Sequence, residues 1–196
     1  YCRGLYTLVA AMRPGFDRQR AAQWAANVLD FRDVDSRRTR FSYATDLTAG
    51  WPASPSLNVW GTERPDLVIT AVANNGTGIT SVDLMNPYLA VVGTGTTELV
   101  DPSLIASGQP NTVDFKKMVG TDSIWRLRTT ATGTANGKDL TANPFSPQAA
   151  QTVTLTTPLV IGGATTVVLE RLADPTQAFN AVTNPYLPVD EKPVSL

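Results

Sequence analysis

The chain has no histidine and a single cysteine, Cys2. Histidine is the usual general base of enzymes, and serine and cysteine triads depend on it. Zinc and copper sites also draw on clusters of histidine and cysteine. A lone cysteine cannot form a disulfide within its own chain. These absences predict a protein that is not an enzyme and that carries no zinc or copper cofactor.

Long apolar runs and a large net charge are lacking as well. No apolar run approaches the roughly 20 residues of a membrane-spanning helix, so we predict no membrane span. The net charge of −1 gives no overall attraction to nucleic acid or anionic lipid. The sequence starts at Tyr1 rather than at methionine. We therefore expect a processed product or an excised fragment, with any export signal upstream.

Arginine is concentrated near the N-terminus. Residues 1–40 contain eight arginines and four aspartates. Because the two charges alternate and few aromatic residues lie between them, the pattern does not favour nucleic acid binding. We interpret it as a solvated helical face with arginine–carboxylate pairs.

Two helices are predicted within residues 1–30. The apolar residues of the first follow the i, i+3, i+4, i+7 spacing of one stripe and are Leu5, Leu8, Val9 and Met12. Pro14-Gly15 interrupts the chain. Asp17 is well placed to start a second helix, which ends near Asp30. The expected stripe of that helix consists of Ala21, Trp24, Ala25, Val28 and Leu29.

After residue 36 the helical period disappears and short alternating runs predict strands. These runs are Thr39–Tyr43, Leu57–Trp60, Leu67–Val72, Ile79–Leu84, Tyr88–Val92, Ile124–Thr130, Val153–Ile161 and Thr165–Leu172. Asn75-Gly76 is a strong hairpin signal because both turn residues accept positive φ. Asn136-Gly137 and Gly162-Gly163 are two further hairpin signals.

Many short strands with tight turns predict a mainly β fold, an antiparallel immunoglobulin-like β-sandwich preceded by two short helices. We place a helical segment at residues 1–36 and the sandwich at residues 37–196. The tail from Asn184 is rich in proline, which suits an extended edge rather than a central strand. Such an extension could add to the sheet edge of a neighbouring molecule.

Two groups of charged residues are candidate sites. Asp30, Asp33 and Asp35 follow the second helix closely, and calcium takes about six to eight oxygen ligands, so they are a candidate weak calcium site. Their spacing is not that of an EF-hand, and helix termination with arginine pairing is the competing interpretation. Arg64, in the sequence Glu63-Arg64-Pro65-Asp66, is predicted to clamp Asp30 or Asp33 and so to join the helical segment to the sandwich.

Three tryptophans, Trp51, Trp60 and Trp125, lie beside short strands and prolines or threonines. Burial in the core is the default interpretation of such residues. The alternative is an exposed platform that binds a glycan or a protein.

Several segments resemble a family of large exported proteins of planctomycetes and verrucomicrobia, some of which are encoded beside pilin-like proteins. The segments that carry this resemblance are residues 22–36 (AQWAANVLDFRDVDS), 59–70 (VWGTERPDLVIT), 171–180 (RLADPTQAFN) and 183–190 (TNPYLPVD). The resemblance implies export and a cell-surface or filament role. The family has no established activity, so it implies no site residue.

A second resemblance, to lamin-tail domains, lies in residues 67–74 (LVITAVAN) and 81–87 (SVDLMNP). It implies an immunoglobulin-like sandwich. Asp83 and Met85 depart from the pattern, which usually has glutamate and tyrosine there.

Together these observations predict a non-catalytic structural module of an extracellular or cell-surface assembly, such as a filament subunit that self-associates. One alternative is an adhesive domain that binds glycans or proteins through Trp51, Trp60 or Trp125. Another is a hydrolase that uses carboxylates such as Asp33 or Glu63.

Overall fold

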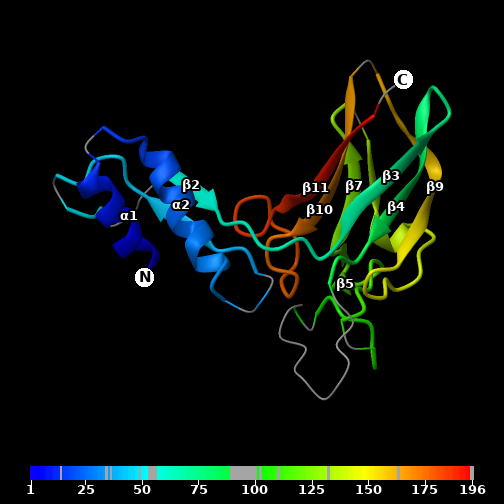
Figure 1. The fold of residues 1–196 in the computed structure, drawn as a ribbon, viewed down its shortest axis with the longest axis horizontal. Coiled ribbons are helices and arrows are strands. Elements are labelled where there is room, and N and C mark those ends of the chain that lie inside the picture. Colours follow the sequence, from blue (N-terminus) through cyan, green and yellow to red (C-terminus); the bar gives the residue numbers. More distant parts are fainter. Residues whose placement is uncertain are drawn as a thin grey trace. The chain divides into compact units, whose positions relative to one another are not determined.

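The computed structural model describes residues 1–13, 15–33, 35, 37–48, 50–52, 57–88, 101, 103–109, 111–131, 133–162 and 164–194. The chain divides into two compact units, Tyr1–Arg64 (unit 1) and Pro65–Leu196 (unit 2). Two helices come first and antiparallel sheets follow (Figure 1), which confirms the predicted mainly β fold with a short helical start.

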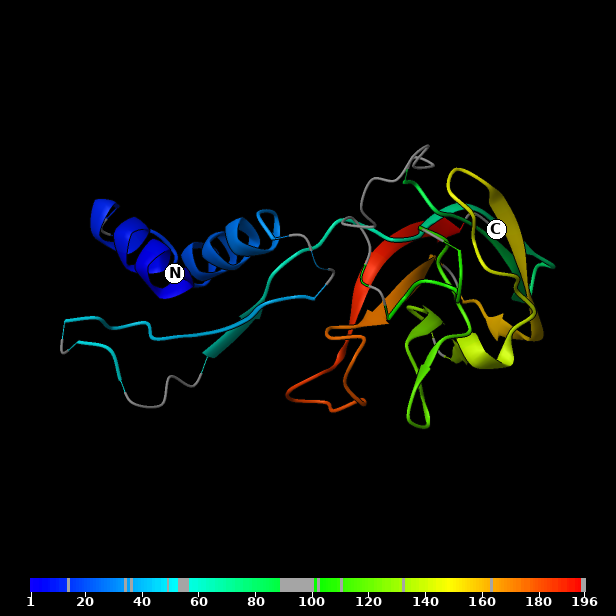
Figure 2. The same cartoon turned by 90° about the horizontal axis from the view of Figure 1, so that it is seen from below.

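Unit 1 combines both helices with a hairpin. The helices α1 (Cys2–Met12) and α2 (Arg18–Asp30) lie side by side (Figure 2). The strands β1 (Arg40–Tyr43) and β2 (Leu57–Trp60) pair antiparallel, with Phe41 opposite Val59. Asp17 caps α2 as predicted, because its carboxylate accepts the N–H groups of Gln19 and Arg20.

The boundary predicted after residue 36 differs from the division after Arg64. The physical reason is the position of the hairpin, whose side chains Phe41, Tyr43 and Val59 are buried in one cluster with the helices. Tyr6 is fully buried at the centre of this cluster, and its hydroxyl donates to the carbonyl of Ala44. The hairpin therefore completes the core of the helical unit.

The buried face of α1 is not the stripe that the apolar spacing predicted. Cys2, Tyr6 and Ala10 are buried, whereas Leu8 and Met12 are 54% and 72% exposed. In α2 the buried positions are alanines and Asp30, while Trp24 is 46% exposed. Small side chains let the helices approach closely, and Tyr6 takes the inner face because its ring meets Phe41 and Tyr43.

Unit 2 is a sandwich of two antiparallel sheets. One sheet has the order β3 (Val68–Asn74), β4 (Gly78–Met85), β9 (Ala150–Val160). The other has the order β11 (Tyr186–Val194), β10 (Thr165–Leu172), β7 (Trp125–Thr129), β8 (Thr134–Asn136). In immunoglobulin lettering these sheets are ABE and GFCC′. Small additional elements are β5 (Met118–Val119), β6 (Asp122–Ser123) and the 3₁₀ turn η1 (Gly137–Asp139).

The core of the sandwich lies between the inner faces of the two sheets. Ile69, Val82 and Val153 come from one sheet, and Leu127 and Leu169 come from the other. Across the open side of the sandwich, the N–H of Ile69 donates to the Asp190 carboxylate and the Lys192 ammonium donates to the Thr70 carbonyl. These bonds connect the two sheets where no disulfide is available.

The turn predictions have mixed outcomes. Asn75-Gly76 joins β3 to β4, with Gly76 at φ +86°, as predicted. Asn136-Gly137 is not a hairpin, because β8 ends there and η1 begins. Gly162 follows β9, but β9 and β10 belong to different sheets, so that hairpin prediction is also wrong. Gly163 and most of the predicted strand 88–92 lie outside the described residues.

The proline-rich tail forms part of its own sandwich. Residues Tyr186–Val194 pair with β10 along their length, and Pro188 stands opposite Glu170 beside a register shift. Proline is tolerated at such an edge because no ladder hydrogen bond has to be donated there. The extended edge was predicted correctly, but its partner is β10 of the same chain and not a neighbour's sheet.

Candidate functional site

An acidic cluster at the end of α2 brings together Asp30, Asp33 and Glu63. Their carboxylate oxygens lie within 4.8 Å of one another. Asp30 is buried, and both of its oxygens accept the backbone N–H of Thr39, at 3.0 and 3.2 Å. A Cβ atom on Gly61 would lie 1.9 Å from Asp30 Oδ2. The carboxylate therefore fits tightly between the two strands of the hairpin and fixes the end of α2 on them.

The charges of this cluster interact with half-buried Arg38. Burial raises the pKa of Asp30 and raises that of Asp33 to about 6, with the neighbouring acids adding to the rise at Asp33. Burial lowers the pKa of Arg38, and the charges of Glu63 and Asp30 oppose this change. A guanidinium beside these acids supplies the positive charge that a cation would otherwise bring.

The predicted calcium ligands are only partly brought together. Asp30 and Asp33 lie in the cluster, but Asp35 is exposed and accepts the N–H of Arg37 instead. Glu63 takes the third place, which spacing along the sequence could not show. The calcium prediction is untested and so is the carboxylate hydrolase, which would use the same Asp33 and Glu63.

Arg64 does not form the predicted clamp. Its side chain is exposed, and among the described residues it makes no ion pair with Asp30 or Asp33. Arg38 has the role of neighbouring cation instead. The charged quartet therefore contributes Glu63 to the acidic cluster, and the neighbouring cation is Arg38 and not Arg64.

The three predicted tryptophans have three different environments. Trp125 is fully buried in the sandwich core, stacked against Phe115 with ring centroids 6.1 Å apart, so it cannot be an exposed platform. Trp51 is half-buried against Tyr6, with the Arg3 guanidinium 4.5 Å from its ring centroid. Trp60 is half-buried on β2, and its carbonyl accepts a hydrogen bond from Gln23. None of them forms a flat open surface.

Unit 1 has an exposed apolar groove between the helices, which we call the helix groove. It has a volume of about 260 Å³ and is lined by Val9, Met12, Arg13, Phe16 and Trp24. Sequence reasoning missed it because Met12 and Trp24 were assigned to the core. Their large exposed apolar surfaces on adjacent helices are typical of an interaction site.

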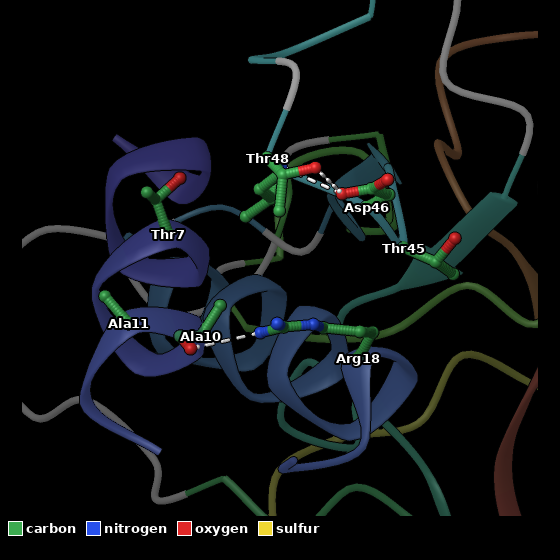
Figure 3. A pocket seen from close by; sticks show the side chains of 8 residues that line it. Thr7, Ala10, Ala11, Arg18, Thr45, Asp46 and Thr48 are labelled. Atoms are coloured by element: carbon green, nitrogen blue, oxygen red, sulfur yellow. Dashed lines mark hydrogen bonds between the residues drawn. The ribbon is translucent and has the colours of Figure 1, made fainter. Parts of the chain in front are cut away.

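A second, more polar pocket of about 270 Å³ lies on another side of α1 (Figure 3). Arg18 donates to the carbonyl of Ala10 at 3.2 Å, and the Asp46 carboxylate accepts the N–H and hydroxyl of Thr48. These hydrogen bonds lower the pKa of Asp46. The charged groups of this pocket are thus held by local bonds that stabilise the loop after β1.

Neither helix in the described part of the chain combines the length and apolarity that crossing a membrane requires, as predicted. Comparison with protein-family models, with curated proteins and with solved structures gave no match. The resemblance to exported planctomycetal and verrucomicrobial proteins therefore stays a prediction.

Proposed function

We propose that this chain is a non-catalytic structural module of an extracellular or cell-surface assembly and that it associates with further copies of itself. The observation that carries the proposal is the helix groove, with Met12 72% and Trp24 46% exposed. Exposure of these apolar side chains to water does not stabilise a monomer, whereas their burial in an interface would be favourable in free energy.

The charge of the two units favours a second copy as the occupant. Unit 1 contains nine arginines and six acids, a net charge of +3, and unit 2 contains seven basic and eleven acidic residues, a net charge of −4. Unit 1 of one copy is therefore electrostatically complementary to unit 2 of another copy. Contacts between two different surfaces repeat from copy to copy, and they produce rings or open filaments.

The test is the oligomeric state of the whole chain, measured by size-exclusion chromatography with light scattering and by electron microscopy. Met12→Glu should weaken association about tenfold or more, because burying a methionine contributes about 1.5–3 kcal/mol and about 1.4 kcal/mol is tenfold. Leu8→Glu is the matched control, since Leu8 is an exposed apolar residue of the same helix, 54% accessible, that does not line the groove. A monodisperse wild-type monomer at high micromolar concentration would contradict the proposal.

Salt separates the two ways in which copies could meet. At about 0.5 M salt the screening length is only about 4 Å, so association between the basic and acidic units should weaken. A symmetric contact between two helix grooves would be strengthened by salt, because it would reduce repulsion between like-charged units. Stronger association at high salt would therefore refute the head-to-tail arrangement while leaving the groove as the interface.

Location is the remaining part of the proposal and is supported by the resemblance described above. Immunogold labelling of intact cells and of thin sections, with antibodies against the whole chain, tests it. Label confined to the cell interior would contradict an extracellular assembly.

A further inference from the structure

The outer face of the GFCC′ sheet carries a cluster of charges that the structural role does not explain. Arg126 and Arg128 lie two residues apart on β7, and Glu170 lies opposite Arg126 on β10. Both arginines bond the same carboxylate: Arg126 Nε lies 2.6 Å from Oε2, and Arg128 Nε lies 2.6 Å from Oε1. The Glu170 side chain is 4% exposed, whereas the arginine side chains are 25% and 32% exposed.

This geometry leaves donors available. A guanidinium has about five N–H groups, and only the Nε group of each arginine is bonded to Glu170. No hydrogen bond within the described part of the chain uses the terminal nitrogens of either arginine. The buried carboxylate thus orients two guanidinium groups whose backbone positions lie about 7 Å apart along one strand. Their orientation is fixed before a ligand arrives, which reduces the entropic cost of binding.

An aromatic surface adjoins the two arginines. The Arg126 guanidinium lies 4.0 Å from the centroid of the Tyr186 ring, and Phe179 stacks on Tyr186 at 5.4 Å. The Tyr186 hydroxyl donates to the carbonyl of Ser123, and the Phe179 N–H donates to the Asp122 carboxylate at 2.8 Å. Phe179 is fixed in this way yet remains 44% exposed.

Two acids border this arrangement. The Asp122 carboxylate lies at the aromatic end, where it accepts the Phe179 N–H. Burial raises the pKa of Tyr186, the Arg126 charge opposes this rise and the Asp122 charge adds to it. Glu191 is exposed and stands opposite Val168, in the same row across the sheet as Arg128. A ligand that is charged along its whole surface would be repelled by these acids. A ligand that carries its carboxylate on an uncharged ring would place neutral surface beside them.

We propose that Arg126, Arg128, Tyr186 and Phe179 form a binding strip for an acidic polysaccharide of the uronate type. The sugar carboxylate accepts hydrogen bonds from the terminal nitrogens of the two arginines, in the paired geometry that guanidinium groups favour. The apolar face of the neighbouring sugar ring packs on Phe179. This strip uses none of the predicted tryptophans and does not depend on self-association.

The experiment is calorimetric titration of the whole chain with three probes at low salt: a tetragalacturonate, its methyl ester and a glutamate tetrapeptide. The tetragalacturonate should bind, and its methyl ester should bind at least about tenfold more weakly because the charge-assisted hydrogen bonds are lost. The glutamate peptide should also bind more weakly, because it has no sugar ring to pack on Phe179.

Variants test the residues separately. Arg128→Gln should reduce tetragalacturonate affinity about tenfold, and Arg128→Lys should not restore it, because lysine lacks the planar fork. Phe179→Ala should reduce affinity without disturbing the ion pairs of Glu170 with Arg126 and Arg128, since Phe179 is exposed. Lys116→Gln is the matched control, because it removes one exposed positive charge elsewhere in unit 2.

Four outcomes would overturn the proposal. The first two are absence of tetragalacturonate binding and equal affinity for its methyl ester. The third is tighter binding of the glutamate peptide, which would make the ligand an acidic peptide. The fourth is a loss of tetragalacturonate affinity in Lys116→Gln equal to that in Arg128→Gln. Retained binding in both Arg128→Gln and Phe179→Ala would show that the site lies elsewhere, which also refutes it.

Discussion

The buried ion pair of unit 2 offers the sharpest prediction of stability. Arg171, on β10, donates from Nη1 to the Asp66 carboxylate, which lies just before β3. Their side chains are 1% and 0% exposed. The Tyr88 hydroxyl also donates to Asp66 at 3.5 Å, and the Arg171 guanidinium lies 5.8 Å from the Trp125 ring centroid.

Asp66→Ala should cost unit 2 about 3–5 kcal/mol, because it leaves a guanidinium in the core without its carboxylate. A unit of this size loses about 3 °C in Tm for each kcal/mol, so its Tm should fall by about 10 °C or more. The double variant Asp66→Leu/Arg171→Met should lie within about 1 kcal/mol of the wild type, since apolar residues of similar volume often replace a buried pair without loss. This contrast separates the cost of removing one partner from the worth of the pair.

The assay is urea denaturation with hydrogen exchange followed by mass spectrometry, which reports unit 1 and unit 2 on separate peptides. Glu191→Ala is the control for removal of an exposed acid from the same unit, with an expected change within about 0.5 kcal/mol. A loss of unfolding free energy below about 1 kcal/mol for Asp66→Ala would refute the reasoning, because removal of one partner from a desolvated ion pair should destabilise the unit by more than that.

Three further predictions concern unit 1. Gly61→Ala should destabilise it by about 1–3 kcal/mol, because the added Cβ would lie 1.9 Å from Asp30 Oδ2. Gly4→Ala should instead stabilise α1 by about 0.5–1 kcal/mol, because nothing lies within 4 Å of the added Cβ. Equal effects of the two variants in thermal melts would contradict this. The pKa of Asp33 is raised from 3.8 to about 6, so the contribution of this group to the stability of unit 1 is greatest below pH 3.8 and is lost as pH rises through about 6. Asp33→Asn should therefore flatten the plot of unfolding free energy against pH between these values, measured with chelator present. An unchanged plot would count against this prediction. The acidic cluster of Asp30, Asp33 and Glu63, which lies beside Arg38, should bind Ca²⁺ with a Kd no lower than about 0.1–1 mM, the range of weak extracellular sites. Asp35→Asn should leave this Kd unchanged. A lower Kd in calorimetry, or weaker binding by Asp35→Asn, would contradict the prediction.

Strands were the part of the fold that the sequence predicted best. β2 and β10 match their predicted ranges, and β1, β4 and β7 differ from theirs only by terminal residues. The alternation that predicts a strand is a local property with a period of two residues, so it is visible without knowledge of the partner strand.

Long-range packing explains what the sequence could not show. The inner face of α1 depends on Tyr6 meeting Phe41 and Tyr43, more than 30 residues away. An apolar stripe based on spacing alone ranks Leu8 and Met12 above a tyrosine, because it gives no weight to aromatic partners elsewhere in the chain. The same limitation placed the hairpin of unit 1 in the sandwich.

The candidate sites show a similar division. Asp30 and Asp33 were identified because they are close in sequence, but Glu63 joins them only through the pairing of β1 with β2. The strip on the GFCC′ sheet corresponds to a charge pattern that is visible in the sequence. Glu170 directly follows the apolar run Val167–Leu169, and Arg126 and Arg128 flank Leu127 at the spacing of an outward face.

The segment Glu63–Asp66 spans the division between the two units and does not form the predicted clamp. Glu63 is held in the acidic cluster of unit 1, and Asp66 is held by Arg171 in unit 2. Only Arg64 and Pro65 connect these two anchored acids, and proline both fixes its own φ and biases the preceding residue toward extended backbone. Pro65 therefore restricts the backbone conformation between the two acids, while the side chain of Arg64 is exposed. It follows that Arg64→Lys should leave both units unchanged, whereas Glu63→Ala and Asp66→Ala should each raise hydrogen exchange in the unit that holds the altered acid.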